Sequence, residues 1–132
     1  MNSVAVIEAI YAAFGRGDIP AILAHLHGDV EWEYAQPSTD VPWFQPRRGR
    51  EAAAGFFQDL GMLEVTKFLP KHVLGTGDIV VAVFDFEATV KATGGQIVET
   101  DGVHIWHFSG DKVASFRHRV DTHQQYLAYH GR

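Results

Sequence analysis

Apolar side chains near the start of the chain recur with the period of a helix. Their spacing of three or four residues predicts an amphipathic helix whose buried face carries Ile7, Ile10, Tyr11 and Phe14. Gly15 and Gly17 should end this helix, because glycine readily adopts the left-handed conformation found after helix C-termini. Asp18 is a good N-cap for a second, short helix that closes at Gly28.

The pattern then changes to a period of two over Val30-Glu31-Trp32-Glu33-Tyr34. Because side chains alternate across a strand, we expect Val30, Trp32 and Tyr34 on one face and both glutamates on the other. The helical period returns between Arg50 and Leu60. There the predicted buried side chains are Ala53, Phe56, Phe57 and Leu60.

Residues 36–49, between this strand and the third helix, follow neither period. Pro37, Pro42 and Pro46 interrupt the segment, which is typical of a loop. At about fourteen residues it is long enough to serve as a lid over a cavity. Trp43 and Phe44 lie in its middle, where an ordinary solvated loop would not carry two aromatic side chains. We therefore predict that this loop gates the mouth of a pocket.

The rest of the chain alternates strand-like runs with short glycine-containing turns. Strands are expected at about 64–74, 79–91, 96–108 and 113–121, followed by a short helix from Gln124 to Tyr129. Helices followed by a series of strands predict an α+β fold, with the helices packed on one side of an antiparallel sheet. A strongly curved sheet of this kind forms a cone whose inside is a natural pocket. We expect one domain over residues 1–132.

Composition narrows the classes of function. The chain has a net charge of -5 and no cysteine, so disulfides, zinc–thiolate sites and thiol nucleophiles are excluded. Its one local basic cluster, Arg47, Arg48 and Arg50, is explained by a helix start, and nucleic-acid binding is not expected. No apolar stretch approaches the roughly 20 residues that span a bilayer. We expect a cytoplasmic protein that does not bind membranes.

Two histidines lie on either side of the last turn, Ser-Gly-Asp-Lys at 109–112. The flanking strand-like runs predict a β-hairpin. A plain four-residue turn would pair His104 with Arg117, whereas a turn with a one-residue bulge would pair His104 with His118. Phe116, His118 and Val120 share one face of the second strand. That face is the expected interior, because the other face carries two arginines and an aspartate that are costly to bury unpaired.

The first strand of this hairpin is apolar on both faces. His104, Trp106 and Phe108 alternate with Val103, Ile105 and His107. A strand of this kind is usually covered on both sides. We therefore expect the cavity on one side and a second copy of the chain on the other, so that Val103 and Ile105 would lie in the interface of a homodimer.

The hairpin, together with three shorter segments, resembles the nuclear transport factor 2-like superfamily, and within it the SnoaL-like polyketide cyclases and their ketosteroid isomerase relatives. The segments are 12–18, 29–32 and 48–57, in the order expected for the family. The resemblance covers nearly the whole chain. It implies the same cone-shaped α+β fold with an internal pocket for a small hydrophobic ligand.

The resemblance also implies roles for individual residues. SnoaL-like cyclases carry a histidine at the position of His104 and an acid/base aspartate at the position of His118. Ketosteroid isomerases would have their general base near Tyr34 and an oxyanion-hole aspartate near His104, and both carboxylates are missing here. The resemblance therefore implies proton abstraction beside a carbonyl, with His118 as base and with His104 and Tyr34 polarising or orienting the substrate.

An imidazole suits that task, because its reference pKa of about 6.5 lets it take or give a proton near neutral pH. The same pocket without a competent base would make the protein a non-catalytic binder of a hydrophobic ligand. In either case the expected ligand contacts are aromatic and apolar side chains, namely Tyr11, Phe14, Trp32, Trp43, Phe57, Phe84, Phe86, Trp106 and Val120.

Neither a metal nor a cofactor is expected. His25 and His27 are two apart on a helix, and His104 and His107 are three apart on a strand, so neither pair shares a face. A limonene-type epoxide hydrolase shares this fold but needs an arginine with two aspartates facing the pocket. Glu99 and Asp101 are the only nearby acids with strand spacing, and no arginine joins them.

Overall fold

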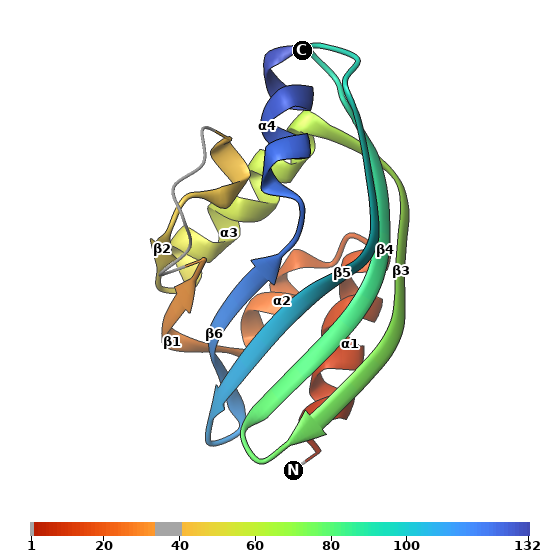
Figure 1. Ribbon diagram of the computed structural model, residues 1–132. Coiled ribbons are helices and arrows are strands. Elements are labelled where there is room, and N and C mark those ends of the chain that lie inside the picture. The colour runs from red at the N-terminus through yellow and green to blue at the C-terminus, as the bar shows by residue number, and fades with distance from the viewer. Residues whose placement is uncertain (1, 34–40) are drawn as a thin grey trace.

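The computed structural model describes residues 2–33 and 41–132. Three helices and two short strands come first, and a series of long strands follows (Figure 1). In chain order the elements are α1 (Ser3–Gly15), α2 (Ile19–Ala24), β1 (Leu26–Trp32), the 3-10 turn η1 (Pro42–Phe44), β2 (Arg47–Arg48), α3 (Arg50–Asp59), the 3-10 turn η2 (Leu60–Met62), β3 (Leu63–Thr76), β4 (Ile79–Val90), β5 (Gln96–Ser109), β6 (Lys112–Arg119) and α4 (Thr122–His130).

The strands form one sheet in the order β2-β1-β6-β5-β4-β3. The sheet curls around the helices without closing on itself, and α1 contacts β3 and β4 while α3 contacts β1 (Figure 1). The predicted α+β cone is therefore confirmed. The expectation of a purely antiparallel sheet is wrong at one place, because β1 runs parallel to β6. The alternation of residues 30–34 indicated a strand but carried no information about its partner.

An extra residue sets the register of the β5–β6 hairpin. Phe108 pairs with Val113 but His107 pairs with Ser115, so Ala114 is an additional residue on β6. From this bulge onward His104 lies opposite His118, as the bulged alternative predicted, and Ile105 rather than His104 lies opposite Arg117. The two imidazoles therefore sit side by side on one face of the sheet.

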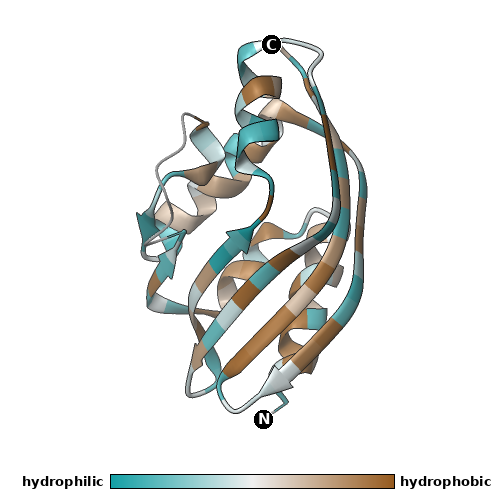
Figure 2. Ribbon diagram, in the orientation of Figure 1, coloured by the Kyte–Doolittle hydropathy of each residue, from teal (hydrophilic) through white to brown (hydrophobic). Residues whose placement is uncertain are grey.

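The expected division of faces also holds. Phe116, His118 and Val120 border the internal cavity, while Arg119 is exposed on the opposite face. On β5, His104, Trp106 and Phe108 are buried and the residues between them are half-buried. Figure 2 shows that apolar residues are frequent along both β4 and β5, as expected for strands covered on their inner side.

Two predictions near β1 are wrong. The second helix ends at Ala24 rather than at Gly28, because Leu26 already pairs with Val113 and Gly28 lies within β1. At the other end of β1, Glu33 adopts a left-handed backbone conformation with φ +62°. The strand stops at Trp32, so its alternation does not continue to Glu33. Tyr34 lies outside the described residues.

Helix α4 packs against the β4–β5 hairpin at one end of the cone (Figure 1). The side chain of Gln124 pairs with the β5 backbone, accepting from the Val98 N–H at 2.7 Å and donating to the Val98 carbonyl at 2.9 Å. Gly95 allows the close approach, because a Cβ there would lie 2.4 Å from the carbonyl oxygen of Ala128. None of the helices in the described part of the chain is long and apolar enough to cross a membrane.

Substituting Gly95→Ala should loosen α4. The new methyl group would meet rigid backbone rather than a flexible side chain, so we expect a loss of about 1–3 kcal/mol in the free energy of unfolding, measured by urea denaturation. Gly61→Ala is the matched control, because a Cβ there meets no atom within 4 Å. Equal stability of the two variants would contradict the close packing of α4.

Candidate active site

An aromatic cavity lies between the helices and the concave face of the sheet. The volume of this cavity is about 80 Å³. All nine side chains expected from the sequence to contact a ligand border this cavity, although their role in binding stays a prediction. The other residues that border it are Ile10, Ile22, Phe44, Phe56, Leu60, Leu63, Phe68, Glu99, His104, Phe116, His118 and Gln125.

His104 is held by a chain of hydrogen bonds that reaches from β5 to α1. The indole Nε1 of Trp106 donates to the hydroxyl of Tyr11 at 3.1 Å, and this hydroxyl lies 2.7 Å from Nδ1 of His104. Indole can only donate, so the Tyr11 oxygen accepts that bond. The Tyr11 proton then has His104 Nδ1 as its only acceptor among the described residues, which leaves the ring proton of neutral His104 on Nε2.

Burial keeps these two groups neutral. His104 is 6% exposed, and the loss of solvation lowers its pKa well below the ordinary value, with a further contribution from the nearby charge of His118. Burial likewise raises the pKa of Tyr11, against the smaller opposing effect of its bond from Trp106. His104 is therefore a neutral hydrogen-bond donor inside the cavity, and not a cation.

His118 is held by a buried carboxylate. Nδ1 of His118 forms a short hydrogen bond with Oε1 of Glu33, and the His118 backbone N–H lies 3.4 Å from Oε2 of the same carboxylate. Glu33 is only 1% exposed. Its backbone N–H donates to the Phe116 carbonyl at 2.9 Å, which fixes it beside β6. A buried carboxylate needs donors of this kind, because an unpaired one would lose its solvation without compensation.

Sequence reasoning missed Glu33 and placed it on the face away from Trp32. The left-handed conformation at Glu33 turns its side chain out of the strand alternation and towards β6. Non-glycine residues rarely adopt this conformation, and nothing in the pattern of residues 30–34 indicates it. Glu31, which does keep the alternation, lies 3.7 Å from Arg48 at the surface.

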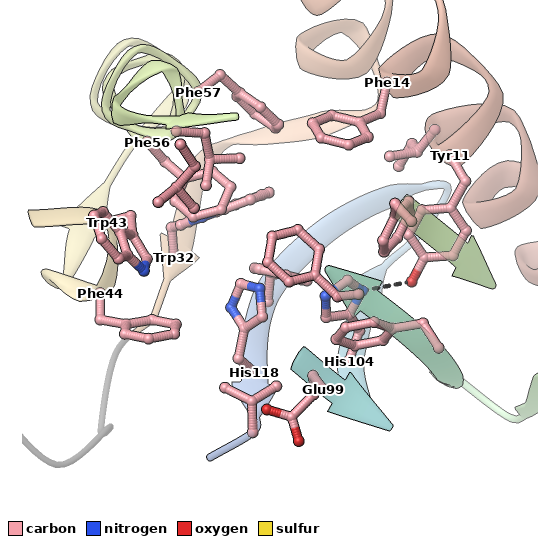
Figure 3. Close-up of a pocket in the computed structure, with 18 of the residues that line it drawn as sticks. Tyr11, Phe14, Trp32, Trp43, Phe44, Phe56, Phe57, Glu99, His104 and His118 are labelled. Atoms are coloured by element: carbon pink, nitrogen blue, oxygen red, sulfur yellow. Dashed lines mark hydrogen bonds between the residues drawn. The ribbon is translucent and has the colours of Figure 1, made fainter. Parts of the chain in front are cut away.

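The two imidazoles therefore face each other with different partners behind them. Their ring centres are 4.6 Å apart and their planes are nearly perpendicular, at 85°. In Figure 3 the His104 nitrogen that is not bonded to Tyr11 points towards His118. With Nδ1 of His118 donating to Glu33, the site presents a neutral N–H donor from His104 beside the Nε2 atom of His118.

A second carboxyl group, Glu99, lies at the rim of the cavity below His118 (Figure 3). Its Oε1 accepts the backbone N–H of Asp121 at 2.9 Å. Partial burial raises its pKa, against the smaller opposing effect of the hydrogen bond from the Asp121 backbone N–H. Asp101 is instead exposed and forms an ion pair with Lys71. No arginine of the described chain borders the cavity, so the epoxide hydrolase constellation is not assembled here.

The predicted lid residues form part of the cavity wall. Trp43 is 2% exposed and Phe44 is 5% exposed, and both border the cavity from η1. Trp43 packs edge-on against Tyr129 of α4, with ring centres 5.6 Å apart. Residues 36–40 of the loop lie outside the described part, and gating by this loop stays a prediction. Within residues 2–33 and 41–132, no group of three or more histidines and acids could hold a metal ion.

The buried state of His104 predicts how stability depends on pH. Below the reference pKa of about 6.5 the unfolded chain takes up a proton at this histidine while the folded chain does not, so acid should destabilise the fold. Lowering the pH from about 7.5 to about 5.5 should therefore lower the free energy of unfolding by about 1.4 kcal/mol through this one histidine. Urea unfolding of His104→Gln, whose amide oxygen can still accept from Tyr11, should show a correspondingly weaker pH dependence. An unchanged dependence would contradict the neutral state of His104.

Comparison with known proteins agrees with this architecture. A family model described as a SnoaL-like domain matches residues 7–116. A nuclear transport factor 2-like protein of Burkholderia xenovorans has 29% identity and a TM-score of 0.80, over 97% of this chain and 92% of that one. TerC, co-crystallized with polyporic acid, has 24% identity and a TM-score of 0.79, over 97% and 98% of the two chains.

A candidate polyketide cyclase of Pseudomonas putida has 20% identity and a TM-score of 0.76, again over 97% of this chain and 98% of that chain. No curated protein sequence matches. The family match spans most of the chain and includes His104 on β5, and it ends at Phe116, two residues before His118. The chain therefore belongs to the SnoaL-like family of the nuclear transport factor 2-like superfamily.

Proposed function

We propose that this protein is a small isomerase or cyclase that transfers protons on an apolar carbonyl compound without a cofactor. The observation that supports this most directly is the Glu33–His118 pair beside a neutral His104. A base, a group that orients it and a hydrogen-bond donor for the oxygen are the parts that proton abstraction beside a carbonyl requires. All three lie in or directly behind an aromatic cavity.

In the proposed step, Nε2 of His118 takes a proton from the carbon next to the substrate carbonyl. The C–H electron pair moves into the carbon–carbon bond, and the carbonyl electrons move onto oxygen. The N–H of His104 donates to this developing enolate oxygen. The Glu33 carboxylate accepts from Nδ1 of His118 and so stabilises the imidazolium that forms.

The imidazolium then returns its proton. In an isomerisation the proton goes to a different carbon of the conjugated system and the carbonyl re-forms. In a cyclisation the enolate carbon first bonds to a second carbonyl carbon of the same molecule, and the proton goes to the resulting alkoxide. Each route ends with His118 neutral, so neither consumes an oxidant, a reductant or a cofactor.

The substrate class follows from the cavity wall, which is mostly aromatic and includes Trp32, Phe84 and Trp106. Such a wall favours a flat, largely apolar molecule. The likeness to a candidate polyketide cyclase and to a protein co-crystallized with polyporic acid supports a ring compound of polyketide-like or steroid-like character. The alternative is a protein that binds such a compound without turning it over.

We further propose a homodimer formed through the outer face of the sheet. Val103 and Ile105 are half-buried there, and Ile105 pairs with Val81, which in turn pairs with Leu74 on β3. Leu74 is 64% exposed. This apolar row has no cover within the described chain, and a second copy would remove it from water.

A generic probe of proton abstraction should test the catalytic proposal. In 5-nitrobenzisoxazole a base removes the ring C–H proton, the N–O bond breaks, and a nitrile and a coloured phenolate form. We expect turnover above that of free imidazole, and a fall of at least about 100-fold in kcat/KM for His118→Ala. Glu33→Gln should lower kcat/KM by about ten-fold, because it removes the charge that stabilises the imidazolium.

His123→Ala is the control, because His123 is exposed on α4 and should leave the rate unchanged. Binding of the probe is measured separately by isothermal titration calorimetry. A protein that binds the probe but turns it over equally well with and without His118 would be a binding protein, and the catalytic proposal would be wrong.

Ile105→Glu should dissociate the proposed dimer. The substitution would place two buried carboxylates in a symmetric interface, where neither has a partner. Sedimentation velocity at micromolar concentration should show a dimer for the natural sequence and for Ile105→Val, which stays apolar. It should show a 14.7 kDa monomer for Ile105→Glu. A monomer in all three samples would exclude this interface.

A further inference from the structure

Gln125 is a buried polar side chain in an otherwise aromatic part of the cavity wall. It lies on α4, is 5% exposed and borders the cavity. A polar side chain at this depth normally has all of its hydrogen-bonding groups satisfied. The hydrogen-bond partners of Gln125 therefore indicate the role of its side chain.

One end of this amide is fixed by Trp43. The indole Nε1 of Trp43 lies 2.7 Å from Oε1 of Gln125. Because an indole N–H can only donate, the oxygen of the amide must face Trp43. The NH₂ group then faces away from Trp43. The oxygen and nitrogen of an amide look alike, and the donor on Trp43 decides which of the two faces it.

The NH₂ group has no hydrogen-bond partner among the described residues. In the described chain, two side-chain polar atoms are fully buried without a hydrogen-bond partner, Trp32 Nε1 and Arg47 Nε. The Gln125 nitrogen is not one of them, so it is not fully buried. Gln125 borders the cavity, so the cavity is a place where its NH₂ group can meet a ligand. The two N–H groups of Gln125 are thus donors beside the cavity that have no partner among the described residues.

We propose that the Gln125 amide binds an acceptor oxygen of the ligand, as a second polar contact separate from the histidine pair. The ligand class is then an apolar compound that carries two oxygen functions, one for His104 and His118 and one for Gln125, with a flat apolar body between them. This inference rests on the proposed function only in treating the cavity as a ligand site. It assigns a specificity-determining role to Gln125, and none in proton transfer.

The chemical test uses probes that differ only at the second oxygen. In 4-methoxyacetophenone and 4-ethylacetophenone an ether oxygen is exchanged for a methylene group of similar size, and 6-methoxy- and 6-ethyl-2-acetylnaphthalene repeat the exchange on a longer body. Isothermal titration calorimetry gives the Kd of each. At one of the two lengths the natural sequence should bind the methoxy compound about ten-fold more tightly than the ethyl compound, as one satisfied hydrogen bond implies.

Two variants of Gln125 test whether that preference comes from its NH₂ group. Gln125→Glu keeps an oxygen for Trp43 but replaces both N–H donors with an acceptor, so the preference for methoxy should disappear. Gln125→Met removes donors and acceptor together and should give the same loss. Because it also leaves the Trp43 N–H unpaired, its melting temperature should fall below that of the natural sequence, and the preference is measured only well below that temperature.

The proposal is overturned if the natural sequence shows no preference at either length, if it binds none of the four probes, or if both variants keep the preference. These results are separate from those of the catalytic test, since only binding is measured. Turnover of 5-nitrobenzisoxazole without a methoxy preference would leave the proposed proton transfer standing and remove the role of Gln125. A methoxy preference without turnover would support the role of Gln125 and contradict the proposed proton transfer.

Discussion

The buried carboxylate of Glu33 is the constraint on which the site depends. A carboxylate at 1% exposure needs nearby donors to replace the water it has lost, and His118 contacts it with its ring Nδ1 and its backbone N–H. Removing His118 would take two hydrogen-bond contacts away from a buried carboxylate and should destabilise the fold. The pair therefore joins the end of β1 to β6 and fixes the orientation of the imidazole at the same time.

Two chemically identical side chains acquire different properties from their neighbours. His104 accepts from Tyr11, is fully enclosed and stays neutral, so it can only offer an N–H to the cavity. His118 instead donates from Nδ1 to the Glu33 carboxylate, which leaves Nε2 as its second ring nitrogen. Burial, together with Tyr11 and Glu33, gives the two imidazoles these different surroundings, and a donor beside a base is the pair that we propose for enolate chemistry.

The wall opposite the sheet is held by polar contacts as well as by packing. Gln124 pairs with the backbone of Val98, and Gln125 with the indole of Trp43, so α4 connects the free end of β5 to η1. These bonds place Trp43 in the wall of the cavity rather than in solvent. Moving Trp43 out of this wall would break its buried hydrogen bond to Gln125.

The sequence by itself determined the sequence of helices and strands, the α+β class and the inward face of β6, because each follows from local periodicity and from the cost of burying Arg117 and Arg119. It also limited the register of the β5–β6 hairpin to two alternatives, and the family resemblance favoured the bulged one that places His104 opposite His118. The parallel pairing of β1 with β6 could not be read from the pattern, since a strand looks the same whichever neighbour it joins. Only the tertiary structure decided that Glu33 supports His118, because a single left-handed residue at the end of β1 reverses the face that alternation assigns. A backbone conformation of that kind is stabilised by contacts with β6 that lie about eighty residues away in the chain, and local sequence carries no trace of them.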